Sequence, residues 1–182
     1  LLLKIKYIVS KYFHVSDILY IKYLNIGNIN STFYVHFSEK NGQQQEIIMQ
    51  KINNYVFNDP IKMNKSLEVF LNYFSSQNII NKNIFIDRRW EMLKLHKTID
   101  TNEILYQDNL DYWRATSFIK SSFTVNTIDN IIRANEVGFA LGIFHSFSRE
   151  FDLKNNQFDF TDLHDTNKYL NKYFIIKYKV DS

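Results

Sequence analysis

The sequence contains no cysteine, a single proline and only 4 glycines in 182 residues. Without cysteine, the chain forms neither a disulfide bond nor a thiolate metal site, which is typical of a reducing compartment and favours a cytoplasmic location. The apolar start at residues 1–9 is interrupted by Lys4 and Lys6. It is therefore too short to span a bilayer, and it lacks the small-residue cleavage site of a signal peptide. We expect no membrane partner.

An excess of charge of one sign is also missing. The 22 basic and 19 acidic residues leave a net charge of +3, and Arg88–Arg89 is the only adjacent pair of arginines. The sequence has no zinc-finger spacing, arginine-rich face or RNA-binding aromatic signature, so nucleic acid is not an expected partner. Apolar residues make up 45% of the chain. That is enough for one sizeable domain or two small lobes, and it leaves the oligomeric state open.

The most structured pattern runs from residue 25 to residue 60. It predicts strands at 18–25, 31–37 and 46–52, joined by a glycine turn at 27–30 and a hairpin turn at 39–42. The Asn41-Gly42 pair readily adopts the positive φ angles of a tight reversal. Alternation along the third strand puts Ile47, Met49 and Lys51 on one face, and Ile48, Gln50 and Ile52 on the other.

Helical spacing predicts a helix at 1–13 and a second helix at 59–77, with Asp59 as N-cap and Pro60 in the first turn. Further strands are expected at 90–95, 104–107 and 112–119. A longer helix is expected at 127–150, a helical or turn-rich piece at 160–173, and an extended apolar tail at 174–180. Strands followed by helices predict an α+β chain with a first lobe at 1–119 and a second, mostly helical part at 120–182.

Two interpretations of Lys51 follow from the residues alone. A glycine turn between two strands, followed by a lysine on the next strand, is how kinase-type folds cover the phosphates of ATP. An ordinary antiparallel meander with a solvated lysine would give the same pattern.

Six short motifs carry a resemblance to a known family. In chain order they are GNINSTF at 27–33, MQKIN at 49–53, VFNDP at 56–60, YWRATSFI at 112–119, GFALGIFH at 138–145 and LHDT at 163–166. The series resembles that of the aminoglycoside phosphotransferase and choline kinase superfamily, and most of all the branch containing N-acetylhexosamine 1-kinase. The resemblance covers only the front half of such enzymes.

The resemblance implies a protein-kinase-like N-lobe, an antiparallel sheet with one helix, followed by the first helices of a C-lobe. It implies ATP and Mg²⁺ as cofactors and a small hydroxylated acceptor, a sugar or amino sugar. Lys51 would act as a point charge on the phosphates, with Glu68 as its helix partner. The remaining nucleotide-binding candidates are the loop residues Gly27, Asn30, Ser31 and Thr32, and the hinge residues Phe118 and Ile119.

Other polar residues have a functional and a structural interpretation. His164 and Asp165 would contact a sugar hydroxyl or serve in a cap or turn. His145 is interpreted as a core or capping residue, and Trp113 as a core tryptophan beside a structural Arg114. Neither of these histidines has a second ligand at metal spacing, so we predict no metal site built from protein ligands alone.

The sequence lacks the catalytic loop of the family, H-[GN]-D-x-x-x-x-N. His164-Asp165 with Asn171 has the wrong spacing, and Asp162 with Asn167 has no preceding histidine. We therefore assign no catalytic residue and expect the chain alone to be inactive. The alternatives are a truncated remnant that acts as a nucleotide-binding or interaction module, and an unrelated α+β binding domain.

Overall fold

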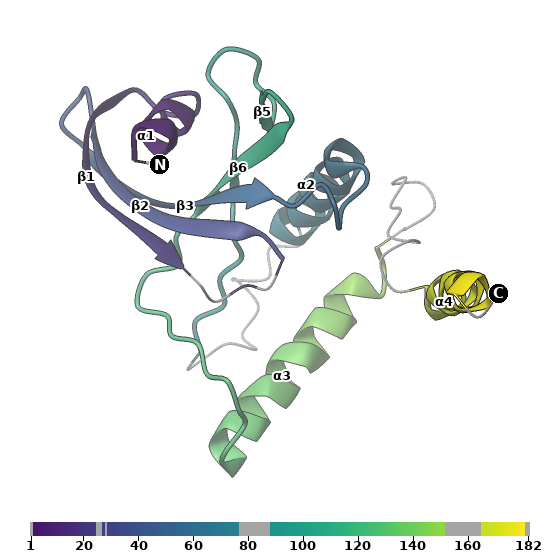
Figure 1. The fold of residues 1–182 in the computed structure, drawn as a ribbon. Coiled ribbons are helices and arrows are strands. Elements are labelled where there is room, and N and C mark those ends of the chain that lie inside the picture. The colour runs from purple at the N-terminus through teal and green to yellow at the C-terminus, as the bar shows by residue number, and fades with distance from the viewer. Residues whose placement is uncertain (1, 25–26, 28, 77–87, 152–164, 181–182) are drawn as a thin grey trace.

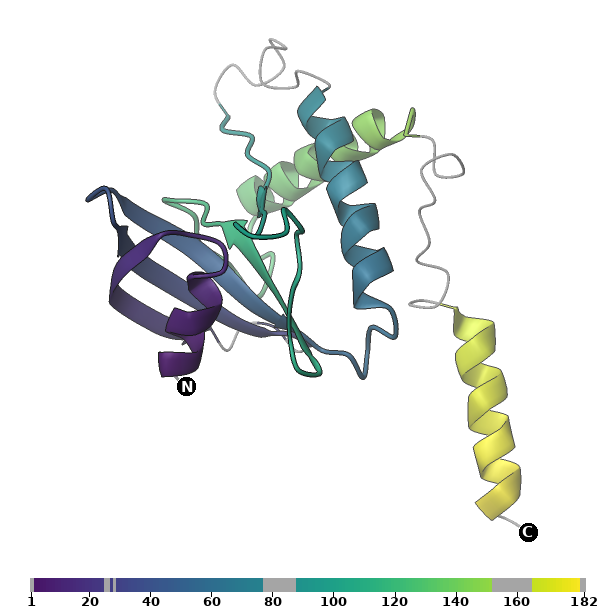
Figure 2. The ribbon, with the colours of Figure 1, turned by 90° about the horizontal axis from the view of Figure 1, so that it is seen from above.

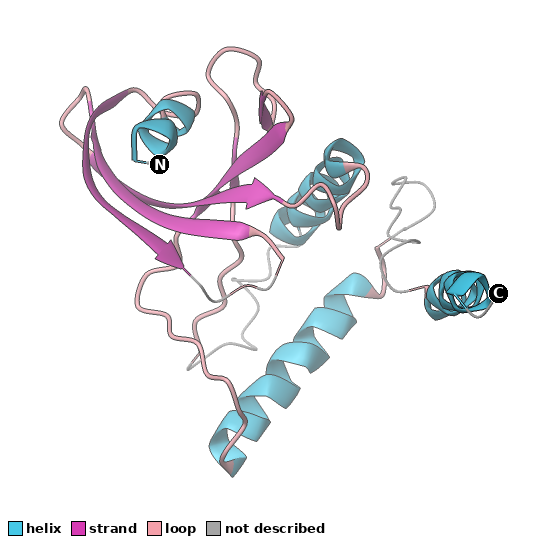
Figure 3. Ribbon diagram, viewed as in Figure 1, coloured by secondary structure: helices cyan, strands magenta, loops and turns pink. Residues whose placement is uncertain are grey.

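The computed structural model describes residues 2–24, 27, 29–76, 88–151 and 165–180. Within these residues the chain is α+β, with a six-stranded antiparallel sheet and four helices (Figures 1 and 3). The elements are α1 (Leu2–Val9), β1 (Val15–Leu24), β2 (Ser31–Glu39), β3 (Gln44–Ile52), α2 (Pro60–Ser76), β4 (Leu95–His96), β5 (Tyr106–Asp108), β6 (Asp111–Ser117), α3 (Ile131–Ser148) and α4 (Thr166–Val180).

The sheet confirms the predicted antiparallel meander and extends it. Its strand order is β1-β2-β3-β6-β4, and the short β5 pairs with β6. The β2–β3 hairpin turns at Gly42, whose φ of 83° lies in the left-handed region that the Asn-Gly pair predicts. Cross-strand pairing sets Lys51 opposite Ser31 on β2 and opposite Trp113 on β6. Three strands therefore bring these residues into one row.

Helix α1 lies in the concave face of the sheet, which curves around it in Figure 1. Three of its residues, and Tyr12 in the turn after it, are buried against the inward side chains of β2, β3 and β6. They form one cluster that comprises Ile5, Ile8, Val9, Tyr12, Phe33, Val35, Phe37, Ile47, Met49, Trp113 and Ala115. The hydroxyl of Tyr12 donates to the carbonyl of Trp113 at 2.7 Å and accepts from the amide of Tyr106 at 2.9 Å. One face of the sheet is thus closed.

Helix α2 contacts the opposite face. Asp59 caps it as predicted, because its carboxylate accepts from the amide of Lys62 at 2.9 Å. Its C-terminal half packs on α3 through Phe74 and Phe147, and the hydroxyl of Tyr73 donates to the carbonyl of Phe147 at 3.0 Å. In the view from above, α2 and α3 cross each other away from α1 (Figure 2).

Two predicted elements are wrong. The strand expected at 90–95 is reduced to Leu95–His96, because only these residues pair with β6. The tail expected to be extended at 174–180 belongs to α4. Its aromatic and β-branched residues favour a strand locally, but Asp165 caps the helix by accepting from the amide of Lys168 at 3.0 Å. No helix in the described part of the chain combines the length and the apolar character needed to cross a bilayer.

The packing of α1 predicts a large effect of one apolar side chain and a small effect of its neighbour. Ile8 is 0% exposed in the core, whereas Leu3 on the same helix is 86% exposed. We expect Ile8→Ala to lower the free energy of unfolding by about 2–5 kcal/mol, because it leaves a cavity between α1 and the sheet. Leu3→Ala is the matched control and should change it by less than about 0.5 kcal/mol in urea titrations. Equal effects of the two substitutions would contradict this packing.

Candidate functional site

The loop before β2 is fastened to the end of β3 by two asparagines. The side chain of Asn30 accepts from the amide of Asn53 at 3.0 Å, and the side chain of Asn53 donates to the carbonyl of Ile29 at 3.2 Å. Gly27 lies in this loop, but residues 25, 26 and 28 are outside the described residues. These two hydrogen bonds hold residues 29 and 30 against the end of β3.

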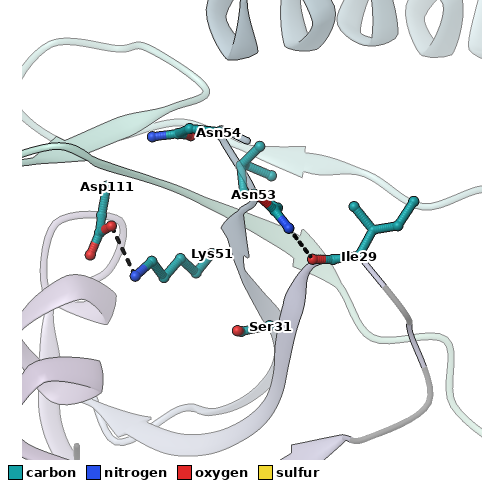
Figure 4. Close-up of a pocket in the computed structure, with 7 residues that line it drawn as sticks. Ile29, Ser31, Lys51, Asn53, Asn54 and Asp111 are labelled. Atoms are coloured by element: carbon teal, nitrogen blue, oxygen red, sulfur yellow. Dashed lines mark hydrogen bonds and ion pairs between the residues drawn. The ribbon is translucent and has the colours of Figure 1, made fainter. Parts of the chain in front are cut away.

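A hollow of about 320 Å³ lies between this loop and the start of β6. It is lined by Ile29, Ser31, Lys51, Ile52, Asn53, Asn54 and Asp111. Figure 4 shows Lys51 pointing toward Asp111, and their Nζ and Oδ1 atoms are 2.9 Å apart. Lys4 of α1 joins the same carboxylate at 3.4 Å and Asp108 at 2.9 Å. Lys51 thus belongs to a four-membered charge cluster on the α1 face.

Opposing effects act on the carboxyl of Asp111. Burial raises its pKa, but the hydrogen bonds and charges of Lys51 and Lys4 outweigh burial and leave the pKa below its ordinary value of 3.8. Asp111 is therefore ionised at neutral pH and neutralises part of the positive charge in the hollow.

The expected Lys51–Glu68 pair is not formed. Glu68 of α2 binds Lys97, with 2.8 Å between Oε1 and Nζ. The reason is strand alternation, because Lys51 shares the α1 face with Ile47 and Met49, while α2 contacts the other face. The sheet separates the two side chains.

The face opposite α1 has an aromatic end where β6 leads toward α3. The rings of Tyr34 and Phe118 meet edge to face with centroids 4.9 Å apart. The hydroxyl of Tyr34 donates to Glu46 at 2.6 Å, and Glu46 also pairs with Lys120. Burial and the Glu46 carboxylate raise the pKa of Tyr34 to about 12, so it stays a neutral donor. These contacts fix the segment after β6 to the sheet.

The same face carries a polar network near the glycine loop. The guanidinium of Arg114 donates from Nε to the Gln50 side chain at 2.8 Å, and from Nη1 to the Asn64 side chain at 2.9 Å. Gln50 in turn donates to the hydroxyl of Thr32 at 3.1 Å. Asn64 is 0% exposed and donates to the carbonyl of Pro60 at 2.8 Å. The network, defined here as Thr32, Gln50, Arg114 and Asn64, joins three strands to α2.

The other candidates are distributed as follows. Ser31 faces Lys51 across the strands, whereas Thr32 belongs to the network on the opposite face. The carbonyl of Ile119 accepts from the hydroxyl of Ser122 at 2.7 Å. Asp165 serves as the cap of α4, as its structural interpretation predicted, and His164 lies outside the described residues. His145 is exposed in the last turn of α3, so the core alternative is wrong, and its carbonyl accepts from the amide of the C-cap residue Arg149.

The metal-binding potential of the described residues is low. Nowhere in residues 2–24, 27, 29–76, 88–151 and 165–180 do three acidic or histidine side chains gather closely enough to hold a metal ion. Mg²⁺ would therefore depend on the oxygens of a bound phosphate or on groups beyond these residues.

Sequence reasoning missed the association of Gln50, Arg114 and Asn64. A signal was present, because Gln50 lies between Ile48 and Ile52 on one face of its strand, and Arg114 lies between Trp113 and Ala115 in the sequence. The sequence alone does not give the strand register, which sets Gln50 directly opposite Arg114. A scan against protein-family models and a search of curated proteins found no match to this chain.

The charge cluster predicts a pH-dependent contribution to stability. We expect Asp111→Asn to lower the free energy of unfolding by about 0.5–1 kcal/mol near pH 7, a small effect because the pairs are partly exposed. The folded pKa of Asp111 is depressed, so its contribution is present above the unfolded pKa and is lost as pH falls through the folded pKa. The wild type and the variant should therefore converge in urea titrations as the pH falls below 3.8 and through the depressed folded pKa of Asp111.

The control for this experiment is Asp17→Asn, because Asp17 is 70% exposed and is 4.0 Å from Lys6. It should have no measurable effect at either pH. A loss of stability in Asp111→Asn that persists at acid pH would mean that Asp111 acts through packing instead of charge.

Proposed function

We propose that this chain is the nucleotide-binding part of an ATP-dependent phosphotransferase that acts on a small hydroxylated acceptor such as a sugar or amino sugar. In a complete enzyme the γ-phosphoryl group would pass to the acceptor hydroxyl with Mg²⁺ as charge partner. Adenine would lie near Phe118 and Ile119, and the phosphates would extend toward the loop at 27–32. The reaction would take place in the cytoplasm, where ATP is supplied.

The observation that carries this proposal is the arrangement of one sheet face. Its Phe118–Tyr34 end is aromatic, and its Arg114 end is cationic and adjoins the glycine loop through Gln50 and Thr32. Residues 114 and 118 are four apart, roughly 13 Å on an extended chain. An extended nucleotide likewise has its aromatic base at one end and its anionic phosphates at the other, which matches the aromatic and cationic ends of this face. The opposite face is filled by α1, and at its charged border Lys51 is already paired with Asp111, beside Asp108.

The motif series supports the same proposal. Three of the motifs that resemble the sugar-kinase branch meet in space, because GNINSTF starts β2, MQKIN ends β3 and YWRATSFI forms β6, and these strands are neighbours in one sheet. VFNDP leads directly into α2, whose Asn64 reaches Arg114.

A second candidate function is an interaction module. It is favoured by α4, where Leu170, Phe174 and Ile176 are 47%, 46% and 54% exposed. Apolar side chains exposed at this density are typical of surfaces that contact another protein.

The adenine end can be tested with one substitution. We expect wild-type protein to bind ATP and adenosine, and Phe118→Ala to weaken both about 3- to 10-fold, since an aromatic contact contributes about 0.5–1.5 kcal/mol. Phe123→Ala is the matched control, because Phe123 is 83% exposed just beyond the same segment. It should leave both affinities unchanged in isothermal titration calorimetry. A wild type that binds neither ligand would refute the nucleotide-binding proposal.

The second test concerns turnover. Because the sequence contains no H-x-D-x-x-x-x-N motif, the group that positions the acceptor hydroxyl is missing. We expect the 182-residue protein to show no phosphoryl transfer above background with ATP, Mg²⁺ and a panel of amino sugars. Thin-layer or coupled assays would measure it, with ATP alone as the blank. Sugar-dependent ADP release would show that other residues supply this group.

A further inference from the structure

Arg114 is held in place by neutral groups only. Its two hydrogen bonds go to the amide oxygens of Gln50 and Asn64, and no ion pair to Arg114 occurs among the described residues. Each amide is itself fixed, Gln50 by Thr32 and Asn64 by the carbonyl of Pro60. The two amides therefore fix the orientation of the guanidinium, and its positive charge has no counter-ion among the described residues.

Such an arrangement is unusual for a partly buried cation. Charged side chains that leave water are normally paired, because an unpaired charge in a low-dielectric setting is strongly destabilising. Burial lowers the pKa of Arg114, and no carboxylate acts to raise it. The remaining N–H groups of the guanidinium make no hydrogen bond to a described residue. They can donate to an anion without breaking the bonds to Gln50 and Asn64.

The neighbours of Arg114 indicate which kind of anion it would bind. Thr32 connects the network to the loop at 29–30, since its hydroxyl is 3.4 Å from the carbonyl of Asn30. The aromatic Tyr34–Phe118 pair lies on the same sheet face. Arginine presents a planar fork that matches two phosphate oxygens.

We propose that Arg114 binds the phosphate chain of a nucleoside triphosphate, with Gln50 and Asn64 as positioning residues. This inference rests on the proposed function and changes its chemistry, because the phosphate charge is met by Arg114 in place of Lys51. Lys51 lies on the other side of the sheet and is already neutralised by Asp111 at 2.9 Å. An anion at Lys51 would also meet the carboxylates of Asp111 and Asp108.

The test compares three ligands, ATP, adenosine and inorganic tripolyphosphate, by isothermal titration calorimetry. Wild type should bind ATP at least 10-fold more tightly than adenosine, and it should bind tripolyphosphate. Arg114→Met should lose about 10- to 100-fold in affinity for ATP and tripolyphosphate while adenosine affinity stays unchanged, because charge-assisted hydrogen bonds are the strong ones. Lys51→Met is the matched control on the opposite face and should change ATP affinity less than about 2-fold.

A second variant guards against loss of the fold. Arg114→Lys keeps the charge but not the planar fork, so ATP affinity should fall about 3- to 10-fold with a circular dichroism melting curve close to wild type. A purely structural role for Arg114 would alter adenosine and ATP binding together and would leave the ATP-to-adenosine ratio unchanged.

The remaining outcomes separate the two proposals. If wild type binds ATP and Lys51→Met loses this binding while Arg114→Met does not, the assignment to Arg114 is overturned and the nucleotide-binding function stands. If tripolyphosphate binds through Arg114 but neither ATP nor adenosine binds, the anion site stands and the nucleotide function is overturned. Absence of binding to all three ligands overturns both.

Discussion

The packing of α1 into the curved sheet is the constraint on which the rest of this structure depends. Ile5, Ile8 and Val9 fill the concave face, and Tyr12 ties the turn after the helix to Trp113 and Tyr106. Since a strand alternates its side chains, closing one face decides the surroundings of every residue on β2, β3 and β6. Residues on the α1 face lie in the core or in the charge cluster at its edge. Residues on the other face contact α2 and the segment that leads to α3. The face of the strand on which a polar residue lies therefore decides which partners it can reach.

Local sequence patterns were sufficient to predict the elements in the first half of the chain. The Asn-Gly pair set the β2–β3 turn, Asp59 and Pro60 set the start of α2, and alternation gave the two faces of β3. They failed where pairing or capping decides the outcome. Residues 90–95 are apolar enough for a strand, but only Lys94 and Leu95 at the end of that stretch find partners on β6. The aromatic and β-branched residues at 174–180 favour a strand individually, yet they continue the helix that Asp165 caps.

The site was harder to predict because its members are joined through register and tertiary contact. Lys51 stands out in the sequence as the single lysine of β3, and that prominence made it the phosphate candidate. Its actual partner, Asp111, is sixty residues away and was indicated by no motif. Gln50, one position earlier, is inconspicuous, but it faces Arg114 across the strands and Asn64 completes the contact from α2. The sequence shows which residues of a strand share a face. Only the packing of helices on the sheet shows which face is the core and which is open to other groups.

Four amide side chains hold the glycine loop and Arg114 in place. Asn30 and Asn53 fasten the loop, and Gln50 and Asn64 hold the guanidinium. Amides do not titrate and carry no net charge, so the geometry they maintain should be indifferent to ionic strength and to the acidity of the surroundings. The cluster around Asp111 on the inward face has the opposite character. The amide contacts that hold the glycine loop and Arg114 are thus insensitive to salt and pH, whereas the charge cluster around Asp111 on the other face responds to both.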